Sequence, residues 1–103
     1  MNLERIKLLE QYIQEDPSDS FSRYALALEW AIEDQDKAVV LLLALIKDDP
    51  QYVPAYYQAA VLLLEQNRIE ETKIVITEGI KMAARQNDHK TIKELRQLQD
   101  ELD

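Results

Sequence analysis

Apolar residues recur at three- and four-residue steps along most of the chain, the spacing that places them on one face of an α-helix. In the first such segment they are Leu3, Ile6, Leu9 or Leu8, Tyr12 and Ile13. Asp16-Pro17 should end this helix, because proline disfavours helical geometry in the residue before it. Similar stripes predict further helices at about 20–33, 37–47, 53–66 and 69–85, and a sixth after residue 88. The chain is predicted to be all-α.

Two of the predicted helices differ from the others in how much of their surface is apolar. Residues 39–46 are apolar on almost every side, which indicates an element covered on more than one side and predicts a central position. The last segment carries only a narrow stripe, formed by Ile92, Leu95, Leu98 and Leu102. A narrow stripe is typical of a helix that closes the end of an array.

The chain also repeats itself. Asp16-Pro17 recurs 33 residues later as Asp49-Pro50, and an alanine, Ala27 or Ala60, stands ten residues after each proline. Ala38, Leu42 and Leu45 recur 34 residues later as Thr72, Ile76 and Gly79. A fixed period of this length indicates stacked helix-turn-helix units. The period divides the chain into a half unit at 1–16, whole units at 17–50 and 51–84, and a closing helix at 85–103.

The composition agrees with a helical protein and limits both the kinds of site it can contain and the compartments in which we expect it. The 103 residues include one glycine, three prolines and no cysteine, so disulfides and thiolate metal sites are excluded. The longest apolar run, residues 38–46, is far shorter than the roughly 20 residues that cross a bilayer. Residues 1–15 mix charges into their apolar stripe, unlike a secretory signal. We therefore expect a soluble, cytoplasmic protein.

The charge is acidic and unevenly distributed. The net charge of −8 repels phosphate backbones and anionic lipid, so neither nucleic acid nor a membrane is an expected partner. Residues 73–96 nevertheless hold six basic and three acidic side chains. This asymmetry would suit an acidic partner or a second copy of the chain.

No residue pattern indicates catalysis, a metal or a cofactor. The single histidine, His89, lies in a polar stretch without a second histidine at ligand spacing. Ser18, Ser20 and Ser22 surround a helix start, where capping accounts for them. Paired carboxylates fall at predicted helix ends, where they would be solvated. The sequence therefore predicts a protein that is not an enzyme.

The repeated residues resemble those of the tetratricopeptide repeat family. Ala27 and Ala60 match the small residue of the family's first helix, Ala38 and Thr72 that of its second helix, and Pro17 and Pro50 its closing proline. The resemblance implies a right-handed α-α superhelix, with small residues where paired helices cross. It also implies a peptide- or protein-binding scaffold whose groove is formed by the first helix of each unit.

Projecting the repeat register places a set of mainly apolar side chains in that groove. The residues expected to contact a partner are Phe21, Tyr24, Leu28, Tyr57, Val61, Leu64 and Glu65. The partner would be a peptide or helix of another protein, of unknown identity. Two alternatives stay open: these side chains are simply part of the core, or the repeats chiefly mediate self-association, as in a homodimer.

Overall fold

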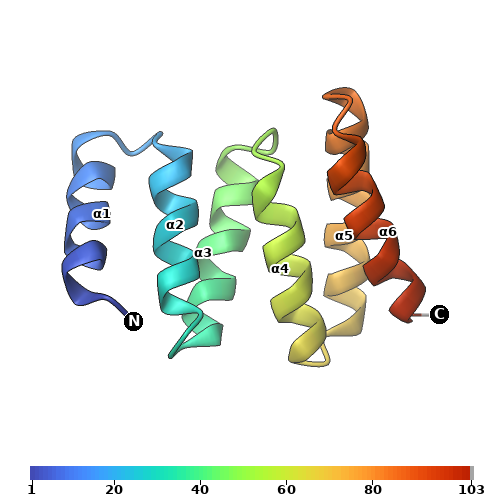
Figure 1. Cartoon of the computed structure of the whole chain (residues 1–103), viewed down its shortest axis with the longest axis horizontal. Coiled ribbons are helices and arrows are strands. Elements are labelled where there is room, and N and C mark those ends of the chain that lie inside the picture. Colours follow the sequence, from blue (N-terminus) through green and yellow to red (C-terminus); the bar gives the residue numbers. More distant parts are fainter. Residues whose placement is uncertain (103) are drawn as a thin grey trace.

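The computed structural model describes residues 1–102, and over that range the chain forms helices joined by short turns (Figure 1). The helices are α1 (Leu3–Glu15), α2 (Ser20–Trp30), α3 (Gln35–Asp48), α4 (Pro54–Glu65), α5 (Ile69–Arg85) and α6 (His89–Leu102). Each helix packs on the next, which gives an antiparallel row measuring 40 × 28 × 20 Å. The predicted all-α fold of six helices is confirmed. Within residues 1–102, no helix is both long and apolar enough to cross a membrane.

Side chains at the helix starts satisfy backbone N–H groups that the helix leaves unpaired. Asn2, Asp19 and Asp34 each accept a hydrogen bond of 3.0 Å from the backbone N–H three residues further on. Asp88 does the same for α6 at 3.1 Å. In α4, Pro54 takes a first-turn position, where its missing N–H costs nothing.

Two helices end in left-handed asparagines. Asn67 and Asn87 have φ values of 59° and 57°, a region in which asparagine is tolerated better than most residues. The N–H of Arg68 then reaches back to the carbonyl of Leu63, and the N–H of Asp88 to the carbonyl of Ala83, both at 2.9 Å. These bonds satisfy carbonyls at the ends of α4 and α5 and reverse the chain for the next helix.

Two predicted helix ends need correction. α2 ends at Trp30 instead of 33, because the N–H of Glu33 bonds to the carbonyl three residues back, at 3.1 Å, in a tighter turn. α3 begins at Gln35 instead of 37, because its cap is Asp34 and not Asp36. Glu33, Asp34 and Asp36 all lie in this turn, so the sequence did not settle where α2 ends and α3 begins.

The core consists of two clusters that meet at the second helix. The larger extends from α2 to α6, and the smaller, with Ile6 and Leu9 at its centre, joins α1 to α2. Trp30 packs against both. The third helix is covered on two sides, by α2 and α4, as predicted. It is not the most enclosed helix, because Val40 is 66% exposed, whereas α4 packs on three helices, α3, α5 and α6.

Small residues occupy the positions where neighbouring helices cross. Ala27, Ala38, Ala60 and Thr72 are all completely buried. The hydroxyl of Thr72 donates to the carbonyl of Arg68 at 2.7 Å, so its polar atom is satisfied in the core. Short side chains here allow the helices to approach closely, as the repeat pattern predicted.

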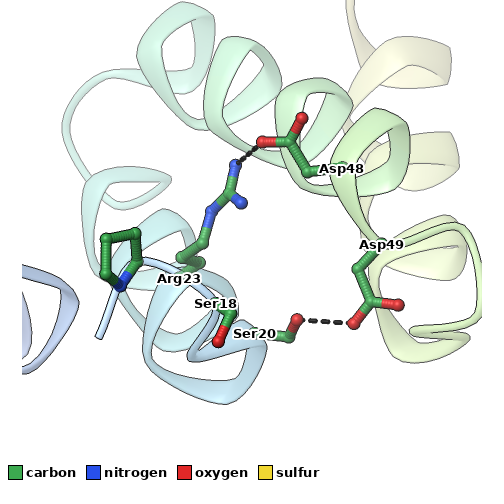
Figure 2. Close-up of a pocket in the computed structure, with 6 residues that line it drawn as sticks. Ser18, Ser20, Arg23, Asp48 and Asp49 are labelled. Carbon is green, nitrogen blue, oxygen red and sulfur yellow. Dashed lines mark hydrogen bonds and ion pairs between the residues drawn. The ribbon is translucent and has the colours of Figure 1, made fainter.

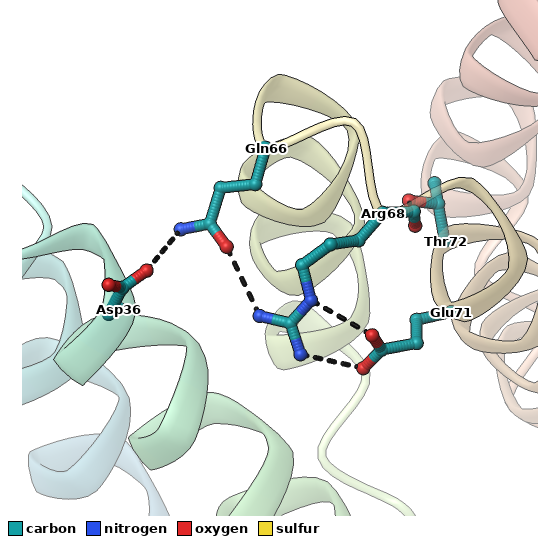
Figure 3. A network of polar contacts seen from close by, with 5 residues as sticks. All are labelled: Asp36, Gln66, Arg68, Glu71 and Thr72. Carbon is teal, nitrogen blue, oxygen red and sulfur yellow. Dashed lines mark hydrogen bonds and ion pairs between the residues drawn. The ribbon is translucent and has the colours of Figure 1, made fainter.

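A polar network ties the turn between α4 and α5 to the start of α3 (Figure 3). The Nε2 atom of Gln66 donates to Asp36 at 3.1 Å, and the guanidinium of Arg68 donates to the Oε1 of Gln66 at 3.1 Å. Arg68 also holds Glu71 through two bonds, at 2.9 and 2.7 Å. The network therefore connects the two repeat units at their lower edge in Figure 1.

The closing helix α6 is built differently from α2. Asp19 and Asp88 play the same part, since each also accepts a hydroxyl hydrogen bond, from Ser22 at 2.6 Å and from Thr91 at 2.7 Å. Counting from these caps, the exposed side chain of Arg96 takes the place of the buried Ala27. The outer side of α6 is therefore polar.

The only glycine, Gly79, lies where α5 passes closest to α4 and α6. A β-carbon added there would lie 2.8 Å from the Cβ of Tyr56 and 2.9 Å from the Cδ1 of Leu95. Tyr56 is itself fixed, because it is 2% exposed and its hydroxyl donates to the carbonyl of Pro50 at 2.7 Å. Glycine is therefore required by packing and not by backbone geometry.

Substituting Gly79→Ala should destabilise the protein. Overpacking costs about 1–3 kcal/mol, whereas the better helix propensity of alanine returns about 1 kcal/mol. Because one contact is with a Cβ, which cannot rotate away, we expect a net loss of about 1–2 kcal/mol. Urea unfolding followed by the fluorescence of Trp30 measures it. Ala84→Gly, at an exposed position of α5, isolates the propensity contribution. An unchanged or raised midpoint for Gly79→Ala would contradict the packing argument.

Stability should fall at acid pH because of the capping carboxylates. Hydrogen bonds from the hydroxyl and backbone N–H of Thr91 lower the pKa of Asp88, and those of Ser22 lower the pKa of Asp19. A carboxyl group whose pKa is lower in the folded chain than in the unfolded chain stabilises the folded chain at pH values above the unfolded pKa of about 3.9. That contribution is lost as pH falls through the folded pKa.

Urea midpoints measured from pH 6 to pH 2.5 test this pH dependence. Asp88→Asn keeps a cap that can accept the hydrogen bonds but does not titrate, so its midpoint should fall less steeply than that of the wild type. Thr91→Ala, which removes the donor hydroxyl, should also flatten the profile. Three parallel profiles would rule out a contribution from this cap.

Candidate functional site

The face formed by α2, α4 and α6 is the candidate site. These three helices begin at the same end, the upper end in Figure 1, so their first turns lie in one row. α6 packs on α5 and α4, and in the figure it lies in front of α5 at the end of the array. It therefore extends the row of helices past α4. We call this surface the front face and define it by Tyr24, Leu28, Tyr57, Val61 and Leu64.

The front-face residues are neither core nor fully exposed. All five are half-buried, and Tyr24, Tyr57, Val61 and Leu64 pack against the larger core cluster. Their neighbours Tyr56 and Leu63, by contrast, are 2% and 0% exposed. The inner side of α4 thus completes the core while its outer side leaves apolar surface accessible.

The other two predicted site residues, Phe21 and Glu65, are more exposed than the five that define the front face. Phe21, in the first turn of α2, is 57% exposed. Glu65, the last residue of α4, is also exposed and accepts a 3.2 Å hydrogen bond from the Nε2 of Gln35. Glu65 is therefore engaged by the start of α3, and Phe21 offers the most accessible apolar surface of the set.

Tyr24 lies in a partly polar surrounding that the sequence did not indicate. Its ring meets that of Tyr52 with centroids 5.7 Å apart and planes tilted by 57°. Burial raises the pKa of the Tyr24 phenol, the neighbouring amide of Gln58 lowers it, and the carboxylate of Glu94 raises it further. Side chains from α2, α4 and α6 thus act on one another at this point.

Three residues of this surrounding, Tyr52, Gln58 and Glu94, were missed by sequence reasoning. Gln58 could have been found from the 33-residue period, and Glu94 by counting from the caps Asp19 and Asp88, since each holds the place that Ala25 holds in α2. The same count places Lys90 and Lys93 where α2 has Phe21 and Tyr24. Tyr52 lies in the loop before α4, where the helical period gives no signal.

A cavity of about 390 Å³ lies apart from the front-face residues, beside the loop between α1 and α2 (Figure 2). Its polar side chains already bind one another. Arg23 lies 2.9 Å from Asp48, and the hydroxyl of Ser20 donates to Asp49 at 2.5 Å. These bonds fasten the start of α2 to the end of α3, so we interpret the cavity as a junction between the two helices of the first repeat unit.

The described residues provide no obvious catalytic or metal-binding arrangement. Among residues 1–102, no group of three or more histidine, cysteine, aspartate or glutamate side chains is placed to hold a metal ion. His89 is exposed at the start of α6. Ser18 and Ser22 donate their hydroxyls to Asp16 and Asp19, both at 2.6 Å, within helix caps and turns.

Two solved structures of a tetratricopeptide repeat domain protein from Salinibacter ruber are similar to this chain. The match to the crystal structure has 29% sequence identity and a TM-score of 0.77, and it covers 82% of the present chain and 96% of the Salinibacter ruber chain. The solution NMR structure is 32% identical, covers 84% and 89%, and has a TM-score of 0.78. No family model matches the sequence, and no curated protein does. Fold, repeat register and these similarities agree that the chain belongs to the tetratricopeptide repeat family.

Proposed function

We propose that this chain is a non-catalytic interaction module that binds a peptide or helix of another protein on its front face. Tetratricopeptide repeat domains are in general protein-interaction modules, and the front face is where this chain has suitable surface. The observation that carries the proposal is the half-buried apolar row of Tyr24 and Leu28 on α2 and Tyr57 and Val61 on α4.

The chemistry of this row suits a segment with apolar side chains. Tyrosine presents a large apolar ring with a hydroxyl that can hydrogen-bond at its edge, and it loses little conformational entropy on binding. Since these side chains already pack against the core, little further ordering is needed when a partner arrives. Phe21, which is 57% exposed, would be the residue most extensively covered.

An enzymatic function has no support in the described residues. Catalytic groups are usually recognised by a strongly shifted pKa inside a cleft, close to a partner that activates them. Here the lowered carboxyl pKa values belong to the helix caps Asp19 and Asp88 and to Glu71, which is paired with Arg68. These groups support the fold. A cytoplasmic location stays a prediction from the sequence.

The proposal predicts that charges on the front face abolish peptide binding. Peptides selected from a random display library on the wild-type protein would be tested against a Leu28→Glu, Tyr57→Glu variant by fluorescence anisotropy. Loss of two central apolar anchors should weaken binding roughly thirty-fold or more. Circular dichroism should show the same helix content, because both side chains are only half-buried.

The matched control places the same charges on α3 and α5. Val40 and Ile74 are 66% and 64% exposed, so Val40→Glu with Ile74→Glu adds two carboxylates without touching the front face. This variant should bind the selected peptides as the wild type does. Binding that survives the front-face substitutions, or that is lost in the control, would refute the proposed site.

A further inference from the structure

The upper end of the helices in Figure 1 carries two charged corners of opposite sign, one on each side. The acidic corner, at the end of α1 and the start of the turn to α2, consists of Glu15 and Asp16. The basic corner, at the end of α5 and the start of α6, consists of Arg85, Lys90 and Lys93. Asp19 also lies at the acidic corner, and Asp88 and Glu94 at the basic corner, but Asp19 and Asp88 are engaged as the caps of α2 and α6.

Neither corner is neutralised from within the chain. The ion pairs among residues 1–102 are Arg5–Glu29, Arg23–Asp48, Arg68–Glu71, Lys73–Glu70 and Lys81–Glu78. None of the five side chains that form the two corners is in this set. Arg85, Lys90 and Lys93 are exposed, as are Glu15 and Asp16. These charges can therefore meet a partner at little desolvation cost.

Apolar side chains of α2 and α4 lie between the corners, and the end of α3 adds the exposed Lys47 and Asp48. Tyr24 and Tyr57 are half-buried, and Phe21, in the first turn of α2 beside the acidic corner, is 57% exposed. A basic corner, an apolar middle and an acidic corner in one row form a self-complementary pattern. A two-fold axis through the middle would place each acidic corner of one copy against the basic corner of the other.

We infer that the front face pairs with the front face of a second copy of this chain, related by a two-fold axis near Tyr57. The inference rests on the charge pattern and not on the proposed peptide binding, with which the dimer would compete for the same surface. An acidic segment from another protein would satisfy only the basic corner, whereas a second copy satisfies both corners at once.

The available area is sufficient for such a dimer. A stable interface buries about 800 Å² of each partner. That is about an eighth of the 6360 Å² that the chain exposes, and the row of helices measures 40 × 28 Å across. Because exposed ion pairs contribute little and are screened by salt, the dimer should be weak and should dissociate as ionic strength rises.

A charge-swap experiment by analytical ultracentrifugation tests the pairing. At low salt the wild type should show a concentration-dependent dimer. Lys90→Glu with Lys93→Glu places acidic corners opposite each other, and Glu15→Lys with Asp16→Lys places basic corners opposite each other. Each variant alone should dimerise roughly tenfold or more weakly. An equimolar mixture of the two variants should recover the dimer, because every facing pair is then of opposite sign.

The controls separate this arrangement from other kinds of association. Tyr57→Glu, at the proposed two-fold axis, should weaken the dimer because it places two carboxylates opposite each other, whereas Ile74→Glu on α5 should not. A wild type that stays monomeric at low salt and high concentration would overturn the inference, and so would variants that fail to recover as a mixture. Either failure would leave the peptide-binding proposal standing, since that is decided by its own selection experiment.

Discussion

Close contact between neighbouring helices is the constraint on which this structure depends. Each crossing is possible because one residue there is small: alanine at 27, 38 and 60, threonine at 72, glycine at 79. Where space is shortest, at Gly79, a tyrosine occupies the room that a side chain would need. Capping and chain reversal then serve to bring these positions opposite one another. If a side chain at residue 79 pushed α5 away from α4, the ring of Tyr56 would no longer fill the space between the two helices.

The arrangement of the helices in a row gives the inner and outer sides of each helix different roles. Since each helix packs mainly on its neighbours, burial is provided by the inner sides of α2 and α4, and their outer sides remain available for contact with other molecules. Adjacent residues can therefore have opposite tasks, as Tyr56 in the core and Tyr57 on the front face show. Trp30 joins the two core clusters, so α1 is coupled to the rest of the chain largely through α2.

Much of this fold could be predicted from the sequence because helices and repeats both leave periodic signals. The bounds of the fifth helix, 69–85, and the small residues at the crossings followed directly from spacing. Helix ends in acidic stretches did not, since Asp34 and Asp36 are equally good caps and only the three-dimensional turn decides between them. The division of the chain at residues 16, 50 and 84 stays a prediction from the period.

The front face shows the same limit. Which side of a helix is turned outward could be projected from the register, but how far each residue is covered depends on the packing of α6. Polar side chains such as Gln58 and Glu94 gave no signal because they follow no apolar pattern. The binding role of the seven projected residues stays a prediction, to be decided by peptide binding and not by further inspection of the fold.

The polar outer side of α6 bears on how proteins of this kind change in length. A repeat array can grow only where its last helix offers a small residue to the next. Here Arg96 stands in that place, and its long side chain keeps another helix at a distance. A further helix packed on this side of α6 would therefore have to bury a charged guanidinium, which is costly without a partner for it. One exposed side chain thus sets the cost of extending the array on this side.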